Sequence, residues 1–235
     1  MLLGPLPWTP RLGAVPFLPC GCPSQPYDEQ RGRAHRTLTD RARQLRLRDA
    51  RWLPGRDVGG TAESRCAAWA LRAAGRAQVA GVTRRRLDAA LYEPAPARQA
   101  QQPGRPRQNG RRWPTLPPVA PAKATRWPRV TVRGWYGERE RPGETVSGPC
   151  VWSHTGMPAG PMRWVLSRAP EGKFETPALL CTRLAATSWP VVEGCGVRWP
   201  VAGTCEEARA HLGMETQRPW SAKAVARTTP GVLGL

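Results

Sequence analysis

Residues 94–137 read PAPARQAQQPGRPRQNGRRWPTLPPVAPAKATRWPRVTVRGWYG, and this stretch decides the fold that we expect. It holds nine prolines, nine basic residues and no acidic residue. Proline lacks a backbone N–H and fixes φ, so it interrupts helices and central strands. A run of like charges also favours an extended, solvated backbone. We therefore expect residues 94–137 to form a basic, disordered linker rich in Pro, Arg and Trp.

The composition of the whole chain extends this expectation. Leu 20, Val 16, Phe 2 and no Ile give 38 of 235 residues, about 16%, with a net charge of +19. Chains with less than about 20% of these residues and a strong net charge are usually disordered. Burying a Leu or Val gains about 1.5–3 kcal/mol, whereas ordering each residue costs roughly 1–2 kcal/mol. The fold class expected is therefore mostly disordered or irregular.

Around the linker the sequence predicts three further segments. Residues 1–36 are apolar and rich in Pro, and we expect them to be irregular. Residues 37–93 contain the helical periodicity, and at best they form a small, marginal all-α segment. Residues 138–235 are expected to be irregular, with short strand-like pieces and one short helix near the C-terminus.

Three short helices are predicted within residues 37–93. The first begins at Thr37, which has the capping-box spacing with Asp40, and ends at Pro54. The second begins at Thr61, continues through Ala at spacings of three and four, and ends near Gly81. The third covers 83–93.

Short strand-like pieces are predicted at 130–133, 164–166 and 190–192, each bounded by Gly or Pro. A last helix is predicted at 205–212, with Thr204 and Glu207 in capping-box positions and Gly213 as its end. None of these pieces is long enough to predict a sheet.

Residues 77–91 resemble a bacterial-type helix-turn-helix. Ala77, Gly81, Val82 and Leu87 match the small, turn and apolar positions of that motif, while Arg76 and Ala90 depart from it. The resemblance implies DNA binding, with Arg84, Arg85 and Arg86 near the start of the recognition helix. A chance match is the alternative interpretation, since Ala, Gly and Arg are abundant in this chain.

The basic linker has the residue types of a non-specific nucleic-acid binder. Arginines neutralise phosphates, and Trp rings offer stacking faces. With the three arginines of the helix-turn-helix match, the candidate nucleic-acid-binding residues are Arg84, Arg85, Arg86, Arg105, Arg107, Arg111, Arg112, Trp113, Arg126, Trp127, Arg129 and Arg133. RNA or DNA is the expected partner, and no small-molecule substrate is indicated.

No enzyme, metal or cofactor signature is found. The chain lacks G-x-S-x-G, H-E-x-x-H, a Walker A loop and a complete G-x-G-x-x-G. The seven Cys do not form paired zinc-knuckle spacings, and Cys20-x-Cys22 is too tight for one. We therefore expect unliganded, reduced thiols and no catalytic activity.

Two interpretations of function remain open, with the helix-turn-helix regulator as a more distant third. One is an orphan or alternate-frame product of a GC-rich reading frame, without a specific molecular function. The other is non-specific RNA or DNA binding by a disordered chain. No apolar stretch of about 18 residues spans a membrane, and prolines interrupt the apolar N-terminus, so we expect no cleaved signal. The predicted location is the nucleus or nucleolus in a nucleated cell, and otherwise the cytoplasm.

Overall fold

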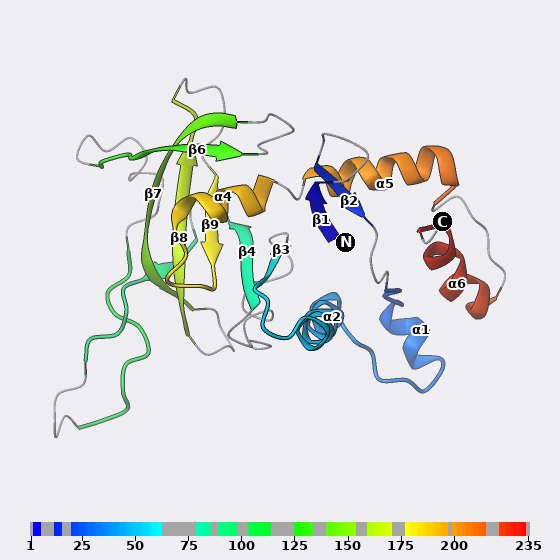
Figure 1. Ribbon diagram of the computed structural model, residues 1–235. Coiled ribbons are helices and arrows are strands. Elements are labelled where there is room, and N and C mark those ends of the chain that lie inside the picture. The colour runs from blue at the N-terminus through cyan, green and yellow to red at the C-terminus, as the bar shows by residue number, and fades with distance from the viewer. Residues whose placement is uncertain are drawn as a thin grey trace.

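The structure, a computed structural model, describes residues 2–5, 12–15, 20–62, 79–85, 89–97, 103–113, 125–133, 140–153, 159–170, 177–196, 199–214 and 221–233. These residues form a seven-stranded mixed β-sheet, a separate two-stranded hairpin and several helices (Figure 1). The hairpin pairs β1 (Leu2–Pro5) with β2 (Leu12–Val15). The expectation of a mostly disordered chain with at best an all-α segment is therefore wrong, because the chain forms a folded α/β domain.

The centre of the sheet is a long antiparallel pair. β7 (Glu140–Trp152) and β8 (Gly160–Arg168) pair from Glu144 opposite Arg168 to the far end of both strands. β8 alternates toward the two faces of the sheet, and its centre holds Trp164 and Val165, an aromatic and a β-branched residue of the types that favour strands. The strand predicted at 164–166 is confirmed as the middle of β8.

The remaining strands extend the sheet on both sides of this pair. β9 (Ala178–Cys181) lies beside β8, β4 (Val79–Arg85) pairs antiparallel with β9, and β3 (Val58–Ala62) lies parallel to β4. On the other side, β6 (Arg129–Arg133) pairs with the start of β7, and β5 (Leu91–Tyr92) pairs with its end. The strand predicted at 130–133 is confirmed as β6.

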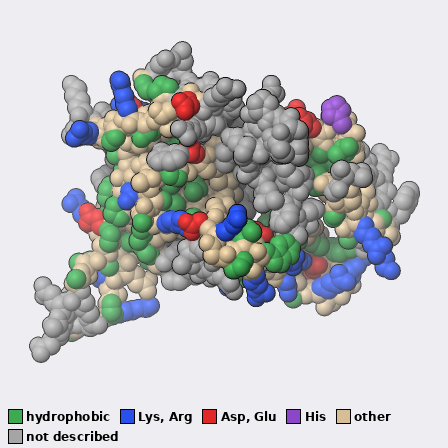
Figure 2. Space-filling model, viewed as in Figure 1, with side chains coloured by type: hydrophobic (Ala, Val, Ile, Leu, Met, Phe, Trp, Pro, Cys, Tyr) green, Lys and Arg blue, Asp and Glu red, His purple; other side chains and the backbone are tan. Residues whose placement is uncertain are grey.

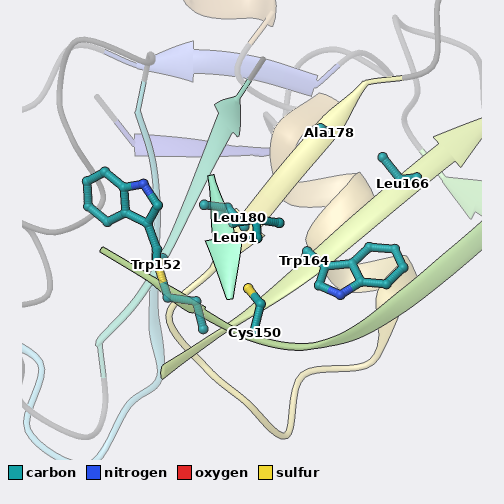
Figure 3. Packing of buried hydrophobic residues seen from close by; sticks show 8 residues of the cluster. Leu91, Cys150, Trp152, Trp164, Leu166, Ala178 and Leu180 are labelled. Carbon is teal, nitrogen blue, oxygen red and sulfur yellow. The ribbon is translucent and has the colours of Figure 1, made fainter. Parts of the chain in front are cut away.

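One face of the sheet carries the larger core cluster. Hydrophobic side chains are conspicuous on the side of the molecule where the sheet lies (Figure 2). The close view in Figure 3 shows members of this cluster, which come from strands far apart in the sequence. Its buried members are Leu91, Cys150, Trp152, Met162, Trp164, Leu166, Ala178 and Leu180.

The opposite face of the sheet is covered by α4 (Ser188–Gly196). Val191 and Val192 of this helix are buried against strand residues, in a cluster that also contains Val82, Val165, Leu179 and Cys181. The strand predicted at 190–192 is therefore wrong. Paired valines favour strands only weakly, and burial of both side chains against the sheet outweighs that preference.

The composition argument failed because it counted only Leu, Val, Ile and Phe. Trp152, Trp164, Met162, Cys150 and Cys181 are all buried, and none of them entered that sum. A Trp buries more apolar area than any aliphatic side chain, and buried thiols behave as small hydrophobes. Twelve of the 36 Leu and Val residues also lie in the seven strands of the sheet, so these residues are denser there than in the chain as a whole.

The helices beyond α4 are α1 (Gln25–Glu29), α2 (Leu38–Trp52), α5 (Trp199–Leu212) and α6 (Ala222–Leu233). α2 confirms the first predicted helix. α5 contains the predicted 205–212 helix but begins earlier, so Thr204 lies inside the helix and does not cap it. Gly213 ends α5 with a φ of 66°, a left-handed conformation that favours glycine.

The other predicted helices are wrong where the structure describes them. Thr61 lies in β3, Thr83 lies in β4, and Leu91 lies in β5. Gly81 and Val82, the proposed turn of the helix-turn-helix, are consecutive residues of β4, so no turn between helices forms there. Pairing with β3 on one side and β9 on the other satisfies the β4 backbone, which outweighs the local helical spacing. Residues 63–78 and 86–88, with Ala77 and Leu87, lie outside the described residues.

Candidate nucleic-acid interface

Exposed arginines gather on the segment that follows α1 and contains all of α2. Residues 31–56 contain nine Arg and two Asp. Blue side chains mark the lower right of the space-filling view, where α1 and α2 lie in Figure 1 (Figure 2). We call the exposed arginines of this segment the α1–α2 basic surface: Arg31, Arg33, Arg36, Arg43, Arg48, Arg51 and Arg56.

α2 is fixed at its start by a reciprocal cap. Thr37 Oγ1 accepts a hydrogen bond from the Asp40 backbone N–H at 3.2 Å, and the Asp40 carboxylate accepts one from the Thr37 N–H at 3.0 Å. The Thr37 hydroxyl also donates to Asp40 at 2.7 Å, and these bonds lower the pKa of that carboxyl. The predicted capping box is confirmed, and it sets where the helix begins and so which face each arginine occupies.

The outer face of α2 carries three of the arginines. At about 100° per residue, Arg43, Arg48 and Arg51 fall within an arc of roughly 140°. All three are exposed, whereas Ala42, Arg46 and Asp49, on the opposite arc, are partly buried. A rigid helix therefore presents three guanidinium groups to solvent on one side.

Arg46 has a different role from its neighbours because it lies on the inner face of α2. Its Nη2 donates a hydrogen bond to the backbone carbonyl of Ala80 in β4 at 2.7 Å, and burial lowers its pKa. Arg46 therefore attaches α2 to the edge of the sheet and does not contribute to the basic surface.

A second group of exposed arginines lies on the segment that was predicted as a disordered linker. Part of that segment is tied to the sheet: the Glu93 N–H donates to the Arg111 carbonyl, and the Trp113 N–H donates to the Leu91 carbonyl, both at 2.8 Å. Residues 111–113 thus lie along β5 as an added extended piece. We call the exposed arginines in the described part of residues 94–137 the linker basic surface: Arg105, Arg107, Arg111, Arg112, Arg126 and Arg129.

The two tryptophans predicted to stack on bases face the protein instead. The ring of Trp113 meets Trp164 edge-on, with centroids 5.6 Å apart, and Trp113 packs against the larger core cluster. Trp127 packs against the same cluster, and the Arg168 guanidinium lies 4.2 Å from its ring centroid. Sequence reasoning chose these rings for their type, and the structure uses them to cover the sheet face that carries the larger core cluster.

The other predicted site residues are scattered. Arg84 is exposed on β4, while Arg85 and Arg133 lie in β4 and β6 with side chains outside the description. Arg86 lies outside the described residues. Arg129 is 82% exposed and stands 3.7 Å from the Glu144 carboxylate, which Arg168 also binds at 2.8 Å.

Sequence reasoning missed the α1–α2 basic surface. Its signal was present in the nine arginines of residues 31–56, but this segment was assessed for its apolar spacing alone.

In the described part of the chain, no group of three or more His, Cys, Asp or Glu side chains could hold a metal ion. None of the described helices is both long and apolar enough to cross a membrane.

No protein-family model matches the chain, and no curated protein has a significantly similar sequence.

Proposed function

We propose that the protein binds RNA or DNA through the phosphate backbone, without preference for base sequence. The observation that carries this proposal is the α1–α2 basic surface, in which seven exposed arginines occupy residues 31–56. Arginine binds phosphate through two parallel hydrogen bonds as well as through its charge. A surface with this density of guanidinium groups therefore suits a polyanion.

We expect no base preference because the groups that carry the proposal are arginines suited to phosphates. Phosphate contacts carry no sequence information, whereas sequence is read at base edges. Trp113 and Trp127 pack against the core, so the part of the linker that the structure describes offers arginines without their stacking partners. Binding should then behave as a polyelectrolyte interaction, driven by release of counterions.

The test is fluorescence anisotropy of labelled oligonucleotides at several salt concentrations. For single strands log K falls with log salt with a slope of about −0.7 per phosphate contacted, so about four contacts give a slope near −3. We expect similar affinities for poly(U), poly(A) and mixed-sequence RNA of equal length. A shallow salt dependence, or one sequence bound far more tightly at physiological salt, would contradict the proposal.

In a nucleated cell the same charge would place the protein in the nucleus or nucleolus, since clustered Arg is typical of nuclear targeting and RNA adhesion. Imaging of the tagged chain tests this location. A signal that stays in the cytosol would count against it.

A further inference from the structure

Two exposed thiols lie in the short irregular segment before α1. The Cys20 thiol donates to the Gly21 carbonyl at 3.6 Å, and the Cys22 thiol donates to the Cys20 carbonyl at 3.7 Å. Both sulfur atoms therefore lie against carbonyl groups of the same Cys-Gly-Cys segment. A Cβ built at Gly21 would meet no heavy atom within 4 Å, so the segment is open on that side.

The number of donors limits which ion this Cys-Gly-Cys segment can hold. Zinc in structural sites takes four ligands, and magnesium or calcium takes six or more oxygen ligands. No third His, Cys, Asp or Glu from the described residues joins Cys20 and Cys22 in a cluster that could hold a metal. Thiolates are soft ligands that select monovalent copper, and this ion is satisfied by two sulfur donors in a nearly linear arrangement.

We propose that Cys20 and Cys22 form a two-thiolate binding site for monovalent copper. On binding, each thiol releases its proton to solvent and forms one Cu–S bond, and the copper stays monovalent, so no electron is transferred. The site does not depend on the nucleic-acid proposal, because none of its donors belongs to the arginine surfaces.

The other described cysteines are poorly placed to compete. Cys150 and Cys181 are buried in the sheet, and burial raises the pKa of both thiols, which opposes formation of the thiolate. Cys195 and Cys205 are partly buried. Cys20 and Cys22 are the exposed thiols among the described cysteines.

The test is an anaerobic titration of the reduced full-length chain with monovalent copper, using bicinchoninate as the competing chelator. We expect the unmodified chain to take one copper ion from the chelator, with affinity rising up to about 100-fold per pH unit because two protons are released. The double variant Cys20→Ser/Cys22→Ser should lose that ion, and each single variant should hold it far more weakly. Circular dichroism of each variant establishes that it is folded.

Cys205→Ser is the matched control, since it removes one thiol but leaves the Cys-Gly-Cys segment intact, and it should still bind the ion. Unchanged copper binding in the folded double variant would overturn the proposal. Equal loss of binding in Cys205→Ser would overturn it as well, because copper would then be held elsewhere. So would a Cys20–Cys22 disulfide that persists in the reduced preparation, detected by alkylation and mass spectrometry.

Discussion

The guanidinium of Arg46 lies against Gly60, so closely that a Cβ built at Gly60 would stand 2.8 Å from Arg46 Cζ. Gly81, the register partner of Gly60 in β4, would place a Cβ 3.2 Å from Arg46 Nη1. The two glycines give the β3–β4 pair a flat patch that admits a planar cation. Arg46 uses this patch to reach the Ala80 carbonyl, so the attachment of α2 depends on both glycines.

Gly60→Ala should therefore lower the free energy of unfolding by about 1–2 kcal/mol. The new methyl group displaces the Arg46 guanidinium and breaks its charged hydrogen bond, an interaction worth about 1.5–3 kcal/mol, while alanine recovers part of this through its smaller entropy cost. Urea denaturation followed by circular dichroism measures the change.

Gly59→Ala is the control in the same strand, because its Cβ would meet no heavy atom within 4 Å. We expect this variant to lie within about 0.5 kcal/mol of the unmodified chain. In an Arg46→Ala background Gly60→Ala should cost little, since the guanidinium is already gone. Equal destabilisation in both backgrounds would show that Arg46 does not fill the patch.

Cys150 should make the protein lose stability at alkaline pH. Burial raises the pKa of this thiol to about 12, whereas the unfolded chain has the ordinary value of 9.0. Between these values the native state keeps a proton that the unfolded state loses, so the free energy of unfolding falls by about 1.4 kcal/mol per pH unit. Below pH 9 this contribution is fully present.

Urea denaturation from pH 8.5 to 10.5, compared with Cys150→Ala, measures the effect. The variant lacks the titrating group and should lose less stability over this range, even though its starting stability is reduced by the missing side chain. The buried Cys181 thiol, whose pKa is also raised, contributes a similar slope to both proteins. If the free energy of unfolding falls equally with pH in the unmodified chain and in Cys150→Ala, the Cys150 thiol ionises as easily in the folded state as in the unfolded chain.

Substitution of Trp127 tests whether its ring packs against the core or stacks on bases. Trp127→Ala should reduce the free energy of unfolding by about 2 kcal/mol, because the ring covers the larger core cluster and carries the Arg168 guanidinium. RNA affinity of the folded variant should stay within about twofold, since no base stacks on this ring. Thermal unfolding and anisotropy measure the two quantities.

Trp52→Ala provides the comparison for Trp127→Ala. This ring is 54% exposed, so we expect a smaller loss of stability. If Trp127→Ala remains folded at the temperature of the assay yet weakens RNA binding tenfold or more, Trp127 reaches the nucleic acid after all.

Sequence reasoning succeeded where the structure is set by neighbours in the chain. The capping pair Thr37 and Asp40 predicts the start of α2 because both groups lie within one helical turn. Gly213 predicts the end of α5 for a similar reason. In each case a few consecutive residues satisfy the backbone groups at a helix end.

Sequence reasoning failed where pairing joins distant segments. β3 and β4 form a parallel pair on either side of residues 63–78, and β4 also pairs with β9 about a hundred residues later. Nothing local in residues 79–85 indicates those partners, so the Ala spacing suggested a helix. The candidate site failed for the same reason, because the outward or inward orientation of Trp113 depends on β5 and Trp164.

The outer face of α2 should account for a measurable part of the salt dependence of nucleic-acid binding. Replacing Arg43, Arg48 and Arg51 by Gln keeps three good helix formers and removes three exposed charges. If all three contact phosphates, the slope of log K against log salt for single-stranded RNA becomes shallower by about 2. Circular dichroism should show an unchanged helix content.

Arg183→Gln is the control for net charge, since the Arg183 guanidinium already binds both oxygens of Asp57, at 2.7 and 2.8 Å. A charge held in an ion pair displaces few counterions, so its removal should leave the slope nearly unchanged. A linker variant, Arg105→Gln/Arg107→Gln/Arg111→Gln, then compares the two basic surfaces. If the α2 triple variant keeps the full slope and the linker variant loses it, the nucleic acid lies along the linker and the α1–α2 basic surface is not the interface.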